Sequence, residues 1–221
     1  AVMFIMTFVM PTFVEMFEGS GLELPLITRF MLGTSTFLSN NLIIILLAIA
    51  IIIVLFNIYK KSPQGIYTIS SLKLRLPIIG NLNKKIIVSR FTRTLSTLLS
   101  AGVSLVHALP TVAGVLENKV AEDAILKIRE RVVRGDGLSN PIRENDIFPK
   151  MLSSMIKIGE ESGALDSILN KTADFYDDEV EQTIQTTTAL IEPLLIVVLG
   201  LVIGTIVISI MLPMFEMYTQ M

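Results

Sequence analysis

The side chains that could bind a cation or a charged partner are mostly carboxylates, and the densest group of them lies in residues 174–181. Asp174, Asp177, Asp178 and Glu181 recur at helical spacing, so a helix would place them near one face. A divalent cation needs oxygen ligands that converge from more than one direction, which a single face does not supply. A solvated helix face is therefore the favoured interpretation, and binding of a cation or a basic partner is the alternative.

A second pair of carboxylates, Glu160 and Glu161, lies between Gly159 and Gly163. Two glycines around a short polar run indicate a turn between helices. The carboxylates in such a turn can cap a helix or pair with an arginine. Capping within the chain is the favoured interpretation, and contact with a partner protein is the alternative.

Other kinds of chemistry lack the residues they need. The chain has one His and no Cys, so it offers no plausible zinc or iron site and no thiol nucleophile. It has no Gly-x-x-x-x-Gly-Lys-Ser/Thr run to bind nucleotide phosphates, and its net charge of −2 gives no basic footprint for nucleic acid. The sequence predicts a protein that is not an enzyme, uses no cofactor or metal and does not bind nucleic acid directly.

Hydrophobicity decides the class of protein. The 221 residues are 52% hydrophobic and only 17% charged, with a mean hydropathy of +0.67, and this composition excludes a wholly soluble globule. Residues 37–58 and 190–212 are each long enough to cross the hydrocarbon core, since a helix rises about 1.5 Å per residue and the core is about 30 Å thick. Lys60 and Lys61 follow the first of these predicted transmembrane helices, which places residues 59–189 in the cytoplasm.

The remaining segments then lie across the membrane from residues 59–189. Residues 11–36 form a short predicted extracytoplasmic loop, and residues 213–221 form a tail on the same side. Residues 1–10 are also apolar and are interpreted as the end of a truncated transmembrane helix. Pro11 and Pro213 are both followed by aromatic and acidic residues, which indicates an internal duplication and a chain that begins inside the last helix of a first half.

Residues 59–189 show a hydrophobic period near 3.6 and few strand signals, which favours an all-α fold of short antiparallel helices. Pro110 removes a backbone donor inside one of these helices, so a kink or an early break is expected there. Helix ends are predicted at Gly102 and Gly135, and helix starts at Ser104 and Pro149.

The last helix is predicted to be unusually long. Between Gly163 and Pro193 the chain contains neither Gly nor Pro, and its apolar positions follow one helical face. An unbroken helix from Leu165 to Leu212 would extend about 72 Å and would continue from the cytoplasmic bundle into the membrane as a stalk.

Four residues of this helix are candidates for kinking it or for packing it against another helix in the membrane. Glu192 and Pro193 lie at the cytoplasmic end of the second transmembrane helix, where Pro193 would kink the helix and Glu192 would reach water or headgroups. The alternative is that Glu192 and Pro193 together act as a mechanical pivot. Gly200 and Gly204 form a Gly-x-x-x-Gly motif, which lets a second helix approach closely in lipid and also occurs by chance.

Several motifs in order along the chain resemble the polytopic platform proteins of type II secretion and type IV pili, the GspF/PilC family. The resemblance covers nearly the whole chain and corresponds to the C-terminal half of the family. The motifs are Arg90-Phe91-Thr92-Arg93-Thr94-Leu95, Leu98-Leu99-Ser100-Ala101-Gly102-Val103, Gly159-Glu160-Glu161-Ser162-Gly163-Ala164-Leu165, Glu192-Pro193 and Pro213-Met214-Phe215.

The resemblance implies two homologous cytoplasmic bundles and three helices in the bacterial inner membrane, of which this chain holds the second bundle. It implies as partners a cytoplasmic secretion or pilus ATPase, pilin or pseudopilin subunits, other inner-membrane assembly proteins, lipid and further copies of the protein. No active site is carried over. Arg90, Arg93, Glu160 and Glu161 match charged family positions and are candidates for contact with partners.

The resulting hypothesis is a non-enzymatic coupler, in which an ATPase moves the cytoplasmic bundle and the long helix transmits that motion to the membrane. A passive self-associating scaffold and a signalling membrane stalk are the alternatives. The 26 residues from Pro11 to Thr36 are short for an external ligand domain, which weakens the signalling hypothesis. Pilus assembly, secretion and DNA uptake stay open.

Overall fold

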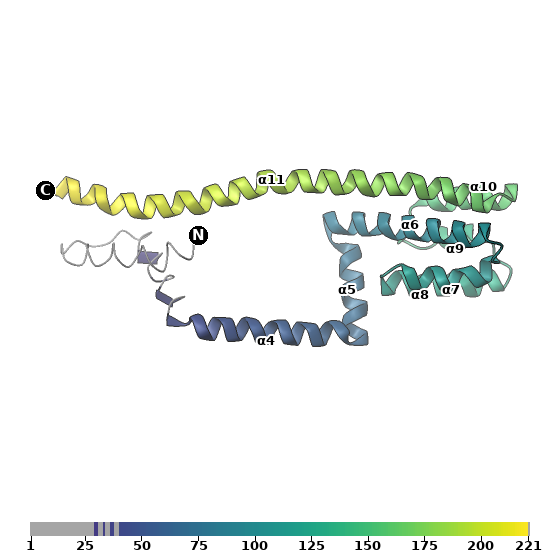
Figure 1. Cartoon of the computed structure of the whole chain (residues 1–221), viewed down its shortest axis with the longest axis horizontal. Coiled ribbons are helices and arrows are strands. Elements are labelled where there is room, and N and C mark those ends of the chain that lie inside the picture. Colours follow the sequence, from purple (N-terminus) through teal and green to yellow (C-terminus); the bar gives the residue numbers. More distant parts are fainter. Residues whose placement is uncertain (1–28, 31–32, 34–35, 38–39, 221) are drawn as a thin grey trace. The chain divides into compact units, whose positions relative to one another are not determined.

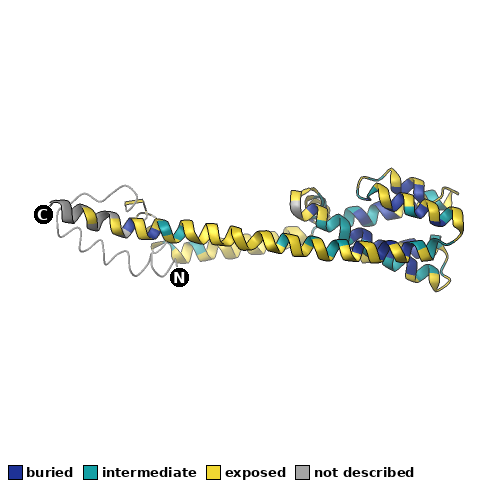
Figure 2. Cartoon of the chain, turned by 90° about the horizontal axis from the view of Figure 1, so that it is seen from above, coloured by how far each residue is buried: buried dark blue, intermediate teal, exposed yellow. Residues whose placement is uncertain are grey.

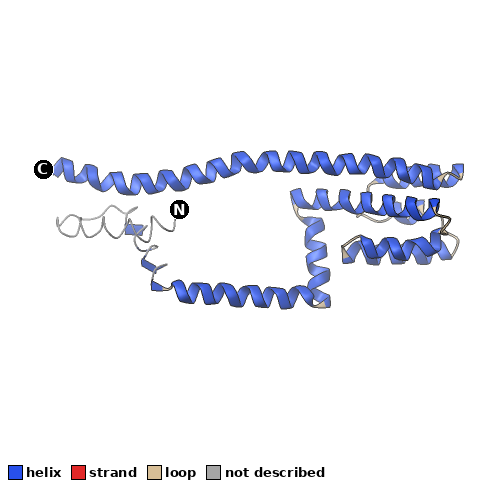
Figure 3. Cartoon of the chain, viewed as in Figure 1, coloured by secondary structure: helices blue, strands red, loops and turns tan. Residues whose placement is uncertain are grey.

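The computed structural model of the chain describes residues 29–30, 33, 36–37 and 40–220 (Figure 1). Every regular element among these residues is a helix, and no strand occurs in this part of the chain (Figure 3). The prediction of an all-α fold is confirmed for these residues. The predicted truncated helix over residues 1–10, and residues 11–28 of the predicted loop, lie outside the described residues.

The helices vary greatly in length, from five residues in α9 to 56 residues in α11. The chain divides into two compact units, of which one comprises Ile58–Ala189. The other takes in the described residues up to Asn57 and those from Leu190 onward. In chain order the helices are α4 (Leu42–Lys61), α5 (Pro63–Arg75), α6 (Pro77–Ser100), α7 (Leu105–Val115), α8 (Lys119–Val133), α9 (Ser139–Arg143), α10 (Lys150–Ser162) and α11 (Leu165–Gln220).

The helix boundaries in the unit Ile58–Ala189 follow from residues that favour helix ends. Gly102 and Gly135 adopt φ values of 82° and 98° just beyond α6 and α8, a left-handed conformation that glycine adopts without strain. Ser104 and Pro149 are the N-cap residues of α7 and α10. The predicted starts and ends at these four positions are confirmed.

Pro110 does not break its helix, contrary to one of the two expected outcomes. Helix α7 continues through Pro110 to Val115. The ring leaves the carbonyl of Val106 without its usual helical donor four residues later. Arg129 of α8 supplies a replacement, because its Nε donates to the Val106 carbonyl oxygen at 3.1 Å. A side chain from a neighbouring helix thus satisfies the acceptor that the proline leaves free.

One apolar core holds the helices of the unit Ile58–Ala189 together (Figure 2). Phe91 of α6 packs against Phe148 with ring centroids 5.6 Å apart. Burying each large apolar side chain contributes roughly 1.5–3 kcal/mol, so this core dominates the stability of the unit. Its fully buried members include Phe91, Leu95, Leu109, Leu116, Ile125, Leu138, Ile142, Leu152, Ile156 and Leu169.

The other unit consists largely of exposed apolar helix. None of the residues of α4 is buried, and most of them are large aliphatic side chains. A helix that is apolar on all sides needs a partner surface or lipid to cover it. Among the residues that the structure describes, two stretches of helix are long and apolar enough to cross a membrane, Leu42–Lys61 and one within Leu165–Ser209.

Helix α11 contains the boundary between the two units, which falls after Ala189. It is helical through both Pro193 and Pro213, so the helix predicted from Leu165 is present and ends later than Leu212. A bend at Pro193 stays a prediction.

Candidate functional site

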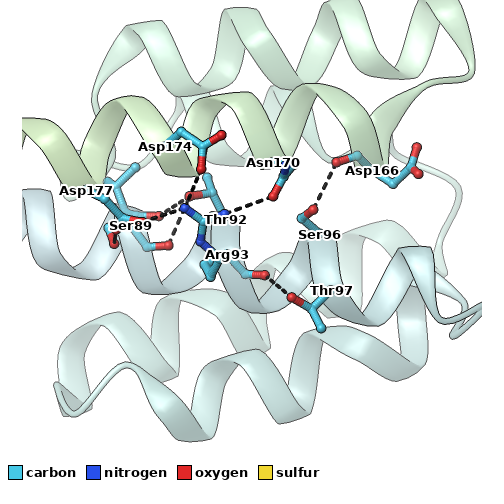
Figure 4. Close-up of polar contacts among 10 residues, drawn as sticks. Ser89, Thr92, Arg93, Ser96, Thr97, Asp166, Asn170, Asp174 and Asp177 are labelled. Atoms are coloured by element: carbon cyan, nitrogen blue, oxygen red, sulfur yellow. Dashed lines mark hydrogen bonds and ion pairs between the residues drawn. The ribbon is translucent and has the colours of Figure 1, made fainter.

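Helices α6 and α11 meet along a line of polar side chains, which we call the polar seam (Figure 4). On α6 its members recur every three or four residues, as do residues 166, 170, 174 and 177 of α11, which puts each of these sets on one face of its helix. Glu179 and Thr183 of α11 extend the contact to Lys85. The two helices run antiparallel, because higher residue numbers on α6 pair with lower residue numbers on α11. The seam consists of Lys85, Ser89, Arg93 and Ser96 from α6 and of Asp166, Asn170, Asp174, Asp177, Glu179 and Thr183 from α11.

Arg93 is the centre of the seam. Its Nη2 lies 2.6 Å from a carboxylate oxygen of Asp174 and 2.6 Å from one of Asp177. Its Nη1 donates to the side-chain oxygen of Asn170 at 2.9 Å. One guanidinium therefore bridges acceptors on two successive turns of α11, and this arrangement fixes the register of the two helices.

Contacts on either side of Arg93 extend the seam. Ser89 donates to Asp177 through its hydroxyl. Toward the N-terminus of α6, the Nζ of Lys85 lies 2.6 Å from Glu179 and 2.9 Å from the hydroxyl oxygen of Thr183. Toward its C-terminus, Ser96 donates to the main-chain carbonyl of Asp166 at 3.0 Å. These contacts span residues 166–183 of α11, which is about 25 Å of helix.

The charges in the seam reinforce one another. Hydrogen bonds to Asp177 and Asp174 raise the pKa of Arg93 above its ordinary value. Burial alone would raise the pKa of Asp177, but hydrogen bonds from Arg93 and Ser89 and the charge of Arg93 outweigh it and hold the pKa below its ordinary value. Both groups are therefore ionised at neutral pH.

Apolar contacts beneath the seam supply most of the attraction between the two helices. Val88 and Leu95 of α6 are fully buried, as are Leu169 and Ala173 of α11, and Tyr176 is almost so. Each ion pair of the seam is partly exposed and contributes only about 0.2–1 kcal/mol. The apolar contacts thus set the strength of the junction, while the seam sets its register.

The seam changes the interpretation of the acidic residues 174–181. Asp174, Asp177 and Glu179 are not simply solvated, since they pair with Arg93 and Lys85 of the same chain. Asp178 is exposed and Glu181 accepts a hydrogen bond from Gln185. No group of His, Cys, Asp or Glu that could hold a metal ion occurs among the described residues.

Glu160 caps a helix, as the favoured interpretation predicts. Its carboxylate accepts hydrogen bonds from the backbone N–H groups of Leu138 and Ser139, at the start of α9. The turn itself begins later than predicted, because α10 includes Gly159 through Ser162. Gly163 ends that helix with a φ of 67°.

Gly159 has a separate role in the same motif. A Cβ at this position would lie 3.0 Å from the Cα of Leu165, so glycine lets the start of α11 pack closely on α10. The motif Gly159–Gly163 therefore fixes how α11 begins and joins α10 to α9.

The four charged candidates do not form one site. Arg93 contacts α11, whereas Arg90 lies on the same helix and pairs with Glu117 at 2.7 Å. Glu160 joins α10 to α9, and Glu161 lies 3.7 Å from Lys157 one turn away. All four thus have partners inside the chain, and contact with another protein stays a prediction.

The candidates on the second apolar stretch all lie on α11. Glu192 and Pro193 are exposed. A Cβ built at Gly200 or Gly204 would meet no atom within 4 Å among the described residues. Their predicted roles as kink and packing residues remain predictions.

Sequence reasoning missed Lys85, Ser89 and Asn170 as members of the seam. The signal that could have found them is the spacing of polar residues on α6, at 85, 89 and 93, on the same helix that carries buried Val88 and Leu95. A polar strip at the edge of an apolar face marks the rim of a helix contact.

The comparisons with known proteins agree on one family. A family model described as type II secretion system protein F matches residues 91–213. The chain is 43% identical over 215 residues to the type IV pilus assembly protein PilC of Thermus thermophilus, covering 96% of this chain and 53% of that protein. It is 35% identical over 213 residues to the type II secretion system protein F of Aeromonas hydrophila, covering 96% and 55%. The chain spans about half the length of these curated relatives.

Proposed function

Because the chain belongs to the family of type II secretion system protein F, we propose that it forms part of the membrane platform on which a type IV pilus or a secretion pseudopilus is assembled. The names of its relatives, a pilus assembly protein and a secretion system protein, support this role. In this proposal residues 37–58 and 190–212 cross the bacterial inner membrane and residues 59–189 lie in the cytoplasm. The two long apolar stretches of helix and the lysines at 60 and 61 support that orientation.

The platform couples a cytoplasmic ATPase to the movement of pilin or pseudopilin subunits out of the bilayer. One observation carries this proposal: the helix that forms the polar seam with α6 is the same helix that contains the apolar residues 190–212. Motion passes between distant sites only through packed elements with defined arrangements, and a helix held in register by the seam is such an element. The chain itself makes and breaks no bond, and ATP hydrolysis belongs to the partner.

Among the charged candidates, Glu161 is the best placed to meet a partner protein. Its side chain is 69% exposed, and its only ion pair with a described residue is a loose one with Lys157 at 3.7 Å. Arg90 is intermediate, since its ion pair with Glu117 is partly exposed but its guanidinium also donates to the carbonyl of Val115 at 3.4 Å. Arg93 and Glu160 hold helices together, so partner contacts through them would also disturb the bundle.

The test replaces the four residues Gln185–Thr188 of α11, which lie between the seam and residue 190, in the gene that encodes this chain. A Gly-Ser-Gly-Ser replacement disfavours helix by about 0.5–1 kcal/mol per residue relative to Ala, whereas Ala-Ala-Ala-Ala keeps the helix and its length. We expect the first variant to lose surface filaments or secreted protein at normal protein level, and the second to keep them. Normal assembly in the Gly-Ser-Gly-Ser variant would refute transmission through α11.

A passive self-associating scaffold is the second candidate function, favoured by Gly200 and Gly204, beside which no described residue fills the place of a Cβ. In that case Gly200→Leu or Gly204→Leu would block assembly by preventing contact between copies, while the Gly-Ser-Gly-Ser replacement would not. The two variants therefore separate a scaffold from a coupler.

A further inference from the structure

Residues 58–79 differ in charge from the rest of the unit Ile58–Ala189. They contain four basic residues, Lys60, Lys61, Lys73 and Arg75, and no carboxylate. Residues 80–189 contain thirteen basic and fifteen acidic residues, a net charge of −2. The positive charge of the unit is thus concentrated in its first 22 residues.

The same four cations are exposed and form no ion pair with any described residue. On the adjoining helix α6, three of the four cations, Lys85, Arg90 and Arg93, each pair with a carboxylate. Residues 58–79 therefore present positive charge that the described chain does not neutralise.

Exposed apolar side chains are concentrated in the same segment. Leu72 is 55% exposed and Tyr67 51% exposed, although both lie on the short helix α5. Among side chains whose burial is described, the segment holds seven exposed large apolar residues, as many as the following 110 residues together. The seven are Ile58, Tyr59, Ile66, Tyr67, Leu72, Leu76 and Ile79, against Val115, Leu126, Val133, Met151, Ile158, Phe175 and Ile184.

A tight turn fixes the start of α5 to the end of α4. Ser62 alone separates the two helices; its hydroxyl donates to the carbonyl of Tyr59 at 2.8 Å and accepts from the N–H of Gly65 at 3.0 Å. A Cβ at Gly65 would lie 1.9 Å from that same carbonyl oxygen, so only glycine fits this approach. The first turn of α5 consequently lies at the same depth as Lys60 and Lys61.

We propose that residues 58–79 bind the headgroup layer of the cytoplasmic leaflet, with the four cations on anionic phospholipid and the exposed apolar side chains among the upper acyl chains. The inference rests on the proposed transmembrane helix at residues 37–58. Helix α5 combines exposed apolar residues with Lys73 and Arg75, and one residue joins it to α4, which contains most of that transmembrane helix, so lipid is the surface nearest to its start. Tyr59 and Tyr67 fit this depth, since tyrosine is enriched at membrane interfaces.

The test uses the full chain in lipid nanodiscs, and the absence of Cys from the sequence allows single labels. A fluorophore is attached in the Leu72→Cys protein, and quenching by lipids that carry a spin label near the headgroup is measured. The Val133→Cys protein is the matched control, because Val133 is 58% exposed on α8 of the same unit. In nanodiscs rich in phosphatidylglycerol, we expect strong quenching at position 72 and none at position 133.

Neutralising two of the four cations tests the electrostatic part of the proposed contact with anionic phospholipid. Each Lys or Arg near an anionic surface contributes about fivefold to binding, so Lys73→Gln with Arg75→Gln should lower the ratio of bound to detached segment roughly 30-fold. High salt should act in the same direction. The proposal would be overturned if the label at position 72 were quenched no more than the label at position 133. It would also be overturned if the two substitutions left the quenching unchanged. The first result is the one expected if the segment binds an acidic protein instead of lipid.

A third label separates this inference from the proposed membrane topology. The Ile52→Cys protein should be quenched by lipids labelled deep in the acyl chain. Quenching at position 52 without quenching at position 72 would overturn the headgroup contact alone. A position 52 that is not quenched would refute the transmembrane helix, and the headgroup contact with it.

Discussion

The pair of Arg93 and Asp177 should contribute a measurable coupling to the stability of the folded chain. Their side chains are 40% and 47% exposed and lie 2.6 Å apart. Solvent at that exposure reduces the ion pair to about 0.5–1 kcal/mol. Arg93→Met, which keeps the aliphatic part of the side chain, also loses Asp174 and Asn170 and should cost about 1–2 kcal/mol in total.

A double-mutant cycle with Arg93→Met and Asp177→Asn isolates the pair. The free energy of unfolding is measured for the four proteins in detergent micelles by circular dichroism, at low and at high salt. We expect a coupling of about 0.5–1 kcal/mol that shrinks at high salt, because the pair is partly screened. A coupling near zero at low salt would contradict the seam described here.

The matched control is the pair of Lys157 and Glu161, whose atoms are 3.7 Å apart on one helix with side chains 61% and 69% exposed. Its coupling should stay at or below about 0.5 kcal/mol, the range of isolated helix pairs. A coupling equal to that of Arg93 and Asp177 would show that the bridge between helices adds nothing.

Three further predictions use the same unfolding measurement. Glu160→Ala should cost about 1–2 kcal/mol because two N–H groups at the start of α9 lose their acceptor, whereas Glu160→Gln keeps one acceptor oxygen and should cost less. Gly163→Ala should cost about 1–2 kcal/mol, since an L side chain is strained at a φ of 67°. The low pKa of Asp177 means that its contribution is complete above the ordinary aspartate value of about 3.9 and is lost as pH falls below it. Asp177→Asn should therefore reduce the loss of unfolding free energy as the pH falls below about 3.9. An unchanged loss in the variant would exclude Asp177 as a cause of this pH dependence.

Much of the fold could be predicted from the sequence because its signals are local. Gly102 and Gly135 mark helix ends through their backbone conformation, and Ser104 marks a helix start as a residue type favoured at the N-cap position. These signals depend only on neighbouring residues. The long apolar runs and the helical period of α11 are equally local. The family resemblance drawn from short motifs is confirmed by the match over residues 91–213.

The seam could not be predicted in the same way, because it depends on register between residues some 80 positions apart. Arg93 was recognised as a charged candidate, but its partners Asp174 and Asp177 were assigned to a solvated face. Pro110 likewise suggested a break, because the sequence does not show that Arg129 of another helix donates to the carbonyl of Val106. Short helices such as α9, with five residues, carry too little periodicity to be found.

The stiffness of α11 between the seam and the apolar residues can be measured directly by the distance between two spin labels. Labels in an Asp178→Cys, Val198→Cys double variant of the full chain in nanodiscs are separated by 20 residues, about 30 Å along an unbroken helix. Coupling through a stiff α11 predicts a narrow distribution centred near that distance. A broad distribution, as a flexible tether gives, would contradict coupling through α11.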